Sequence, residues 1–496
     1  QSKGRLASDR MAKGRWAMFR WVQSLDSLLK RGNLRLLGLG LLLAWVYCTW
    51  FSNGIFEPFS SRSADTLRLS LVASAIGLIA LAFRPNKRKP IGQAPIFWSA
   101  AIMSASTLLF FALPSGVALM VDAFVGGLAS AILWVAWGEM FCRIGQDRAE
   151  SCIPASLAVF VAAALMAYLL PWPAAGILSA LCPIVSALML LLSDNSQGSE
   201  FLFRAPQLPF LNVLPSLGKL ALCSMACSLA TGFVITSFSP QDLLIGGEGL
   251  ILAYVLGGVA AGCIAAFAIA HTSRMSFSFL YEWAIPLIVF SLSLRVLGDP
   301  FCNTLATVLA CTAALYVEVL FYALFARITA GGLCLPSETF GIFRSMVQLG
   351  FLAGGLLGSF ASTSTPPLLP TGLALICVCV VILPLFIHLQ KRFEVPTGQF
   401  IDSPDNHEAA GDAATVSEPM STAQTLDAIA AEYKLSARER EVLDYLGRGR
   451  SVPYMREVMV ISKSTIETHI KHIYAKTDVH SKQELLDLIE SKRTPR

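Results

Sequence analysis

Charged residues are scarce in this chain. Asp, Glu, Lys and Arg make up 14% of its 496 residues, whereas they make up about a quarter of an average soluble protein. Hydrophobic residues reach 55%, and the formal net charge is only +5. So little charge cannot cover the surface of a soluble protein of this length, which excludes that class. The composition therefore predicts a polytopic membrane protein.

The sequence also lacks the motifs that mark common enzymes and metal sites. It has no recognisable phosphate-binding or dinucleotide-binding glycine motif, no phosphotransfer histidine region and no nucleophile triad. The twelve cysteines lie between Cys48 and Cys379, and no histidine stands at metal-ligand spacing from them. We therefore expect no catalytic residue, no metal and no cofactor, and an enzyme working within the membrane has little support.

Long apolar runs are the main feature that is present. Twelve runs approach the ~20 residues that a helix needs to cross ~30 Å of hydrocarbon, and they are too long for barrel strands. The predicted fold is therefore all-α, with a twelve-helix transmembrane bundle. The runs lie at residues 34–56, 66–83, 94–113, 116–138, 152–172, 174–193, 213–238, 250–271, 277–297, 304–325, 340–360 and 368–388.

The Lys and Arg residues of the short loops set the expected orientation, because cytoplasmic loops carry an excess of both. If the basic segment 1–33 is cytoplasmic, the outer loops hold only Arg62. The inner loops then hold Arg84, Lys87, Arg88, Lys89, Arg143, Arg148, Arg204, Arg274 and Arg327. We therefore expect a multi-pass protein of the cytoplasmic (inner) membrane with both termini in the cytoplasm.

Two similar pentapeptides indicate a repeated six-helix unit. The fourth predicted span ends in MFCRI at residues 140–144, and the tenth ends in LFARI at residues 324–328. Two six-helix bundles are thus predicted at 34–192 and 213–389, joined by a cytoplasmic connector at 193–212. This layout resembles the major facilitator superfamily of transporters, although the loop at 84–90 lacks the Gly and Asp of that family's loop motif.

Ionisable residues within the apolar runs are candidates for a ligand pocket. Each costs roughly 2.5–3.5 kcal/mol at the centre of a membrane helix, which favours a position facing the bundle interior or a cavity. Three lie near span ends, where we expect them to reach water: Asp122, Glu282 and Arg295. The candidate pocket residues, which lie deeper or beside helix-facing neighbours, are Lys219, Glu318 and Arg344.

The composition changes abruptly after the last run. Residues 394–424 contain six acids and three prolines but no Lys or Arg, which predicts a disordered acidic linker at 390–424. The linker leads to a C-terminal domain at 425–496.

Four short helices with a tight turn before the third are predicted for the C-terminal domain, the pattern of a helix-turn-helix. Ser436 and Glu439 have the spacing of a capping box at the start of the first helix. The others are expected at about 451–459, 463–477 and 481–490. In the third, Ile466, Ile470 and Ile473 recur at i, i+4 and i+7, which predicts one buried face.

The opposite face of the third helix carries the residues expected to contact DNA. Lys can donate to guanine, Glu can accept from cytosine, and a Thr methyl can contact thymine. The base-reading candidates are Glu467, Thr468, Lys471 and His472. Contacts to phosphates, which fix the register, are expected from Arg450, Lys463, Ser464, Thr465 and Lys476. A solvated face on a small helical bundle is the common alternative for such charges.

Several of these residues follow one known pattern: Leu435-Ser436, the run 438–443, Gly449, Ile461-Ser462, Thr465-Ile466, His469, Ile473, Lys476 and Val479. Residues 435–490 thereby resemble the LuxR-type (NarL/FixJ-type) helix-turn-helix regulators. By position, the resemblance implies base reading by Glu467, Thr468 and Lys471. It also implies that the last helix dimerises, with Leu485, Leu486 and Ile489 as the candidate contacts.

The small charge of the C-terminal domain also favours a homodimer on DNA. Residues 425–496 hold 13 basic and 11 acidic residues, a net charge of +2. A two-fold dimer on double-stranded promoter DNA predicts half-sites about one turn apart.

Together these features predict a membrane-embedded one-component transcription regulator. Its partners would be the lipid bilayer, promoter DNA and an unknown small-molecule inducer. The alternative is a secondary transporter of the major facilitator type with a regulatory DNA-binding tail. Substrate uptake into vesicles by a chain without the tail would distinguish the two.

Overall fold

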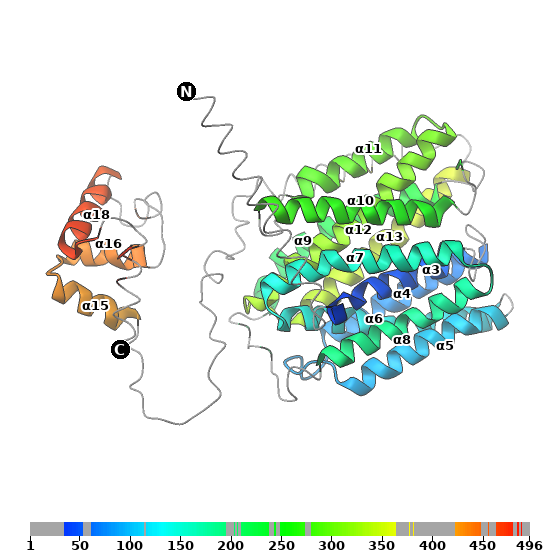
Figure 1. Cartoon of the computed structure of the whole chain (residues 1–496), viewed down its shortest axis with the longest axis horizontal. Helices are drawn as coiled ribbons and strands as arrows, with labels where there is room; N and C mark the ends of the chain where they lie inside the picture. The colour runs from blue at the N-terminus through cyan, green and yellow to red at the C-terminus, as the bar shows by residue number, and fades with distance from the viewer. Residues whose placement is uncertain are drawn as a thin grey trace. The chain divides into compact units, whose positions relative to one another are not determined.

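The chain divides into two compact units, Gln1–Ser403 and Pro404–Arg496, and the boundary falls within the expected linker. The computed structural model describes residues 34–52, 61–113, 116–194, 203, 206, 210–237, 243–244, 249–272, 279–363, 376, 380, 422–447, 455, 463–479, 484–485 and 488. These residues form helices and no strand, as the predicted all-α class requires. Figure 1 labels the helices of both units.

The first unit is a bundle of long apolar helices that lie side by side (Figure 1). Within the described residues, nine are long and apolar enough to cross a membrane, which makes this a multi-pass membrane protein. The helices are η1 (Arg35–Gly38), α3 (Leu39–Trp50), α4 (Ser61–Ala82), α5 (Gln93–Ala112), α6 (Val117–Arg143), α7 (Gln146–Leu169), α8 (Ala174–Asp194), α9 (Phe210–Thr236), α10 (Gly249–Thr272), the π-helix η4 (Leu280–Ala284), α11 (Ile285–Arg295), α12 (Pro300–Ala330) and α13 (Pro336–Thr363).

The predicted apolar runs correspond closely to these helices. Across the described ranges, eleven of the twelve runs coincide with a helix or with a short helix and its continuation, as for η1 with α3 and η4 with α11. The twelfth run, 368–388, lies outside the described residues except for 376 and 380. The expected number of twelve spans therefore stays a prediction.

The helices of the first unit pack in matching pairs. Helix α4 packs on α6 as α10 packs on α12, and α3 packs on α7 as α9 packs on α13. Between the halves, α4 contacts α13 and α10 contacts α7. If α3 and α9 are numbered as first helices, each of these seams joins a second helix to a fifth helix. A pseudo-twofold axis between two similar halves produces this matching of contacts, in which the second helix of each half packs on the fifth helix of the other.

Helix α13 approaches α9 closely through glycine. A Cβ added at Gly354 would overlap the carbonyl oxygen of Leu229, and one added at Gly350 would overlap that of Met225. These glycines are one helical turn apart, so they form a continuous contact with α9. Small residues of this kind allow helices to pack tightly in lipid, where no hydrophobic force drives them together.

The second unit has its own small hydrophobic core. Helices α15 (Thr422–Glu432), α16 (Ala437–Gly447) and α18 (Lys463–Thr477) contribute to it, together with Met455, Val479 and Leu485. Helix α15 begins within the stretch expected to be disordered linker. Leu426 and Ile429 could have revealed it, because their i, i+3 spacing puts both on one face, and both are fully buried.

Candidate nucleic-acid interface and buried charge pair

Helix α18 buries one side and exposes the other. Ile466 and Ile473 are fully buried, and Ile470 is partly buried against the same core. The predicted helix bounds 463–477 and the predicted buried face are both confirmed. The opposite face of α18 is therefore directed away from the core of its own unit.

That opposite face carries three of the residues expected to contact DNA. Glu467, Thr468 and Lys471 are exposed, and so is Thr465 on the neighbouring flank. Lys463 and Ser464 lie in the first turn of α18, but their side chains are outside the described residues, as is all of Arg450. A lysine, a threonine and a glutamate thus lie together on the exposed face, and side chains of these three types can pair with base edges in a major groove.

The predicted capping box starts helix α16. The Ser436 hydroxyl accepts a hydrogen bond from the backbone N–H of Glu439 at 3.3 Å, and the Ser436 N–H donates to Glu439 Oε2 at 2.7 Å. Two N–H groups at the helix start are thereby satisfied. This reciprocal contact also fixes the Glu439 carboxylate, which is almost fully buried.

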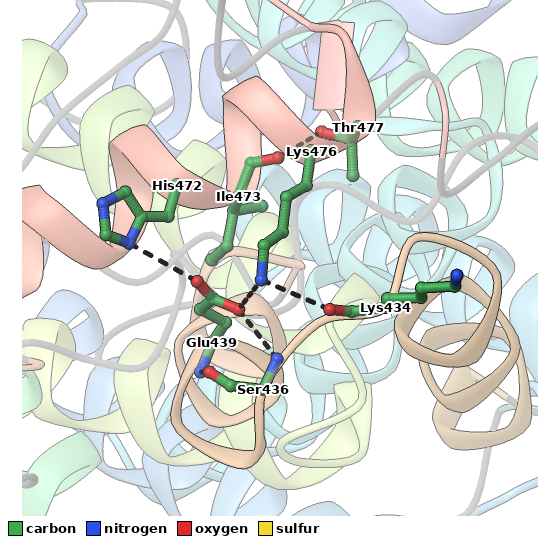
Figure 2. Close-up of polar contacts among 7 residues, drawn as sticks. All are labelled: Lys434, Ser436, Glu439, His472, Ile473, Lys476 and Thr477. Carbon is green, nitrogen blue, oxygen red and sulfur yellow. Dashed lines mark hydrogen bonds and ion pairs between the residues drawn. The ribbon is translucent and has the colours of Figure 1, made fainter.

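The same carboxylate contacts α18, as Figure 2 shows. Lys476 Nζ donates to Glu439 Oε2 at 2.7 Å, and His472 Nδ1 lies 3.5 Å from Oε1. Lys476 also donates to the backbone oxygen of Lys434 at 3.2 Å, beyond the end of α15. We expected His472 to read bases and Lys476 to bind phosphate, but in this structure both face Glu439 of their own unit.

The Glu439 cluster is expected to make the second unit less stable in acid. The hydrogen bond from Lys476, supported by those from Ser436, lowers the pKa of Glu439 from 4.5 to about 2. A carboxylate whose pKa is lower in the folded state than in the unfolded state stabilises the fold at pH values above its unfolded-state pKa. That stabilisation is lost as the pH falls through the folded-state pKa.

We expect helix α18 to lose hydrogen-exchange protection between pH 4.5 and 2 in the native chain. A Glu439→Gln variant, already less protected, should show a flatter profile; equal profiles would contradict this.

The expected dimer contacts receive a correction at one position. Leu485 is fully buried within the core of the second unit, so its side chain is not available at a dimer surface. An apolar residue in a capping-box helix can face inward or outward, and the sequence alone did not decide between them. Leu486 and Ile489 lie outside the described residues.

The first unit contains a buried ion pair between two of the three candidate pocket residues. Arg344 on α13 donates from Nη1 to Glu318 Oε2 on α12, and both side chains are less than 10% exposed. The Arg344 guanidinium also lies over the ring of Trp134 on α6, 3.7 Å from its centroid. Lys219 lies half-buried on α9. The pair thus joins two helices of the second half, and the Trp134 contact links it to α6 of the first half.

The ion pair leaves hydrogen-bonding capacity unused. Glu318 Oε1, Arg344 Nε and Gln348 Oε1 are buried without a hydrogen-bond partner among the described residues. Nearby, the Tyr322 hydroxyl donates to the Trp134 backbone oxygen at 3.1 Å. Buried polar groups are nearly always satisfied, so these atoms have the capacity to bond to a further polar group.

The residues expected to reach water behave differently from one another. Glu282 is exposed, and Asp122 is partly buried and accepts from the Ser106 hydroxyl at 3.1 Å. Arg295 corrects the expectation, because it is buried and donates to the Ser237 backbone oxygen at 2.6 Å and to Asn303 Oδ1 at 3.2 Å. Neighbouring polar groups rather than water satisfy this guanidinium.

Further charge pairs join the halves near the predicted inner loops. Arg327, in the second of the repeated pentapeptides, donates from Nε to Glu150 Oε1 on α7 at 2.8 Å. Lys87, after α4, pairs with Glu338 on α13 at 2.8 Å. Each pair crosses from one half to the other, so these loops are tied together by charge as well as by packing.

A family model for bacterial regulatory proteins of the luxR family matches residues 433–489, which span the capping box, helix α16 and helix α18. Residues 433–489 are a LuxR-family domain. The matched residues include the exposed α18 face and the buried Ile466 and Ile473.

Among solved structures, the chain is similar to the human organic anion transporter MFSD10 (TETRAN). The two share 16% sequence identity, and the match has a TM-score of 0.45 and covers 75% of this chain and 99% of that one. No curated protein sequence matches the chain.

Proposed function

We propose that this protein is a membrane-embedded transcription regulator. Its LuxR-family domain binds promoter DNA through the exposed face of α18, and its membrane unit senses a small molecule. The observation that carries the proposal is the orientation of α18: with Ile466 and Ile473 buried, Lys471 and its neighbours are exposed in a domain of a regulatory family. A face with Glu, Thr and Lys suits the donor and acceptor pattern of a major groove.

The proposed sensing site is the Glu318–Arg344 pair beside Trp134. Its unused donor and acceptor atoms support a small polar molecule as the inducer. To transmit a signal, that molecule must bind two states of the membrane unit with different affinity. A screen for small molecules that induce neighbouring genes, repeated with Glu318→Gln, tests this part, because a response unchanged by the substitution would remove the pair from sensing.

We propose that the regulator acts on DNA as a homodimer. The net charge of +2 over residues 425–496 provides little electrostatic attraction for one copy. Two copies on paired half-sites double the contacts.

Lys471→Met is expected to reduce base discrimination. The test selects binding sequences from a randomised pool of DNA duplexes with the full chain in detergent micelles. Loss of one lysine contact to a base edge should relax the preference at one base pair of each half-site, by about 1–3 kcal/mol. Sequencing of the bound duplexes measures the preference, and a native chain that enriches no sequence would overturn the proposed function.

Lys463→Met is the matched control. Lys463 is the first residue of α18 and is predicted to bind phosphate. Its loss should therefore lower the affinity for every duplex by the same factor. The dependence of affinity on salt should become shallower by roughly 0.9 in the logarithmic slope. An altered base preference in this variant would contradict the assignment of the two lysines.

A further inference from the structure

We propose that Glu439 is the positioning residue of the LuxR-family domain. It ties the flank of α18 that carries His472 and Lys476 to the first turn of α16, and so sets the angle at which α18 meets DNA. This inference rests on the proposed DNA binding and assigns the Lys476 ammonium to a contact within its own domain rather than to a phosphate.

The geometry of the Glu439 carboxylate supports this role. It is 5% exposed, and one oxygen accepts both the Ser436 N–H and the Lys476 ammonium, each at 2.7 Å. The other oxygen lies 3.5 Å from His472 Nδ1 (Figure 2). Two residues one turn apart on α18 are thus held by one side chain that is itself fixed by a capping box.

The backbone after α15 supports the same cluster. Lys434 has a φ of 52°, in the left-handed region, and the Leu435 N–H reaches back to the Ala430 oxygen at 2.9 Å. This turn ends the helix, and the Lys434 carbonyl accepts a second hydrogen bond from Lys476 at 3.2 Å. The Lys476 ammonium therefore joins three segments of the domain, namely α18, the start of α16 and the end of α15.

The burial of the Glu439 carboxylate distinguishes this pair from an ordinary surface ion pair, because Glu439 is 5% exposed while Lys476 is 40% exposed. Arg438 and Glu441, also on α16, pair at 2.7 Å, but their side chains are 62% and 41% exposed. Exposed pairs of that kind contribute little to stability, whereas a charged hydrogen bond to a buried carboxylate contributes more. Glu441→Gln is therefore a matched control on the same helix.

The sign of the effect on DNA binding separates positioning from simple electrostatics. Glu439→Gln removes a negative charge, which by itself should strengthen the attraction of DNA phosphates. It also frees Lys476, which would strengthen binding further if that lysine served as a phosphate contact. Positioning predicts the opposite result for a specific duplex, because a tilted α18 no longer matches the base edges.

The experiment uses the full chain in detergent with two probes, a duplex selected by the native chain and a duplex of scrambled sequence. We expect Glu439→Gln and Lys476→Met each to lower the affinity for the selected duplex about tenfold. Glu439→Gln should bind the scrambled duplex no more weakly than the native chain does. Both variants should increase hydrogen exchange in residues 463–477. The double variant should be no worse than either single one, because the two residues act as one contact.

Other outcomes would overturn the proposal. One is that Glu439→Gln binds both duplexes as tightly as the native chain does. The other is that Lys476→Met loses affinity for both duplexes and its logarithmic salt dependence becomes shallower by about 0.9, which is the signature of a phosphate contact. If Glu439→Gln unfolds the domain, Lys476→Met decides, because it leaves the capping box intact. If the native chain selects no sequence, the proposed function fails, while hydrogen exchange still tests the contact between α16 and α18.

Discussion

Glu318→Leu is expected to destabilise the membrane unit by about 3–5 kcal/mol, because it leaves the Arg344 guanidinium buried without its carboxylate. Arg344→Met should cost less. An isolated carboxyl group can take up a proton, whereas a guanidinium cannot lose its charge.

The double variant Glu318→Leu/Arg344→Met is the decisive comparison. The double variant removes both charges and fills a similar volume with apolar side chains. It should restore most of the lost stability, because two ions no longer have to be desolvated on folding. Asp65→Asn, which breaks an exposed pair with Arg68, is the surface control and should change stability by less than about 1 kcal/mol. A double variant less stable than either single one would contradict the account.

Tryptophan fluorescence can follow this unfolding in the full chain. All nine tryptophans lie between Trp16 and Trp283, so none belongs to the LuxR-family domain. Thermal midpoints from this signal therefore report on the membrane unit, and Trp134 lies directly against Arg344.

Ile473→Ala is expected to unfold the LuxR-family domain. Ile473 is fully buried, and truncation of such a side chain costs about 2–5 kcal/mol through lost burial and the cavity left behind. A unit of this size has only a few kcal/mol of net stability, so one such loss is sufficient. Hydrogen exchange should then be fast throughout residues 437–447 and 463–477, while the tryptophan signal of the membrane unit stays native.

Ile473→Val provides a graded comparison. It removes one methylene group at the same position and should cost about 0.5–1.5 kcal/mol, which leaves the domain folded but less protected. Equal protection in the alanine and native chains would mean that α18 does not depend on this core, and the orientation of its exposed face would lose its support.

Local patterns in the sequence were sufficient for the features of α16 and α18 that matter most. The capping box at Ser436 and Glu439 marked a helix start, and the spacing of Ile466, Ile470 and Ile473 marked a buried face. Both signals arise within a few residues, because caps and helix periodicity depend on neighbours along the chain. The apolar runs predicted the described membrane helices for the same reason.

Such local patterns could not predict contacts between residues that are far apart in the sequence. Lys476 is 37 positions from Glu439, and a lysine on a helix flank has the same local sequence whether it meets a phosphate or a buried carboxylate. Arg295 likewise appeared to be at a helix end facing water, but its partner Ser237 is 58 positions away. In each case tertiary packing selected the partner.

The pairing of cations within the LuxR-family domain bears on how it would search a genome. Lys476, Arg438 and Arg440 each face a carboxylate, respectively Glu439, Glu441 and Asp427. Charges neutralised in this way displace few counterions, so a single copy would hold non-cognate sequence weakly and leave it quickly. Discrimination among the ~10⁶ or more competing sites of a chromosome would then depend on base-edge contacts rather than on non-specific attraction to the phosphate backbone. Under the proposed function, this weak binding would suit a DNA-binding domain that is anchored to a membrane and cannot slide far along DNA.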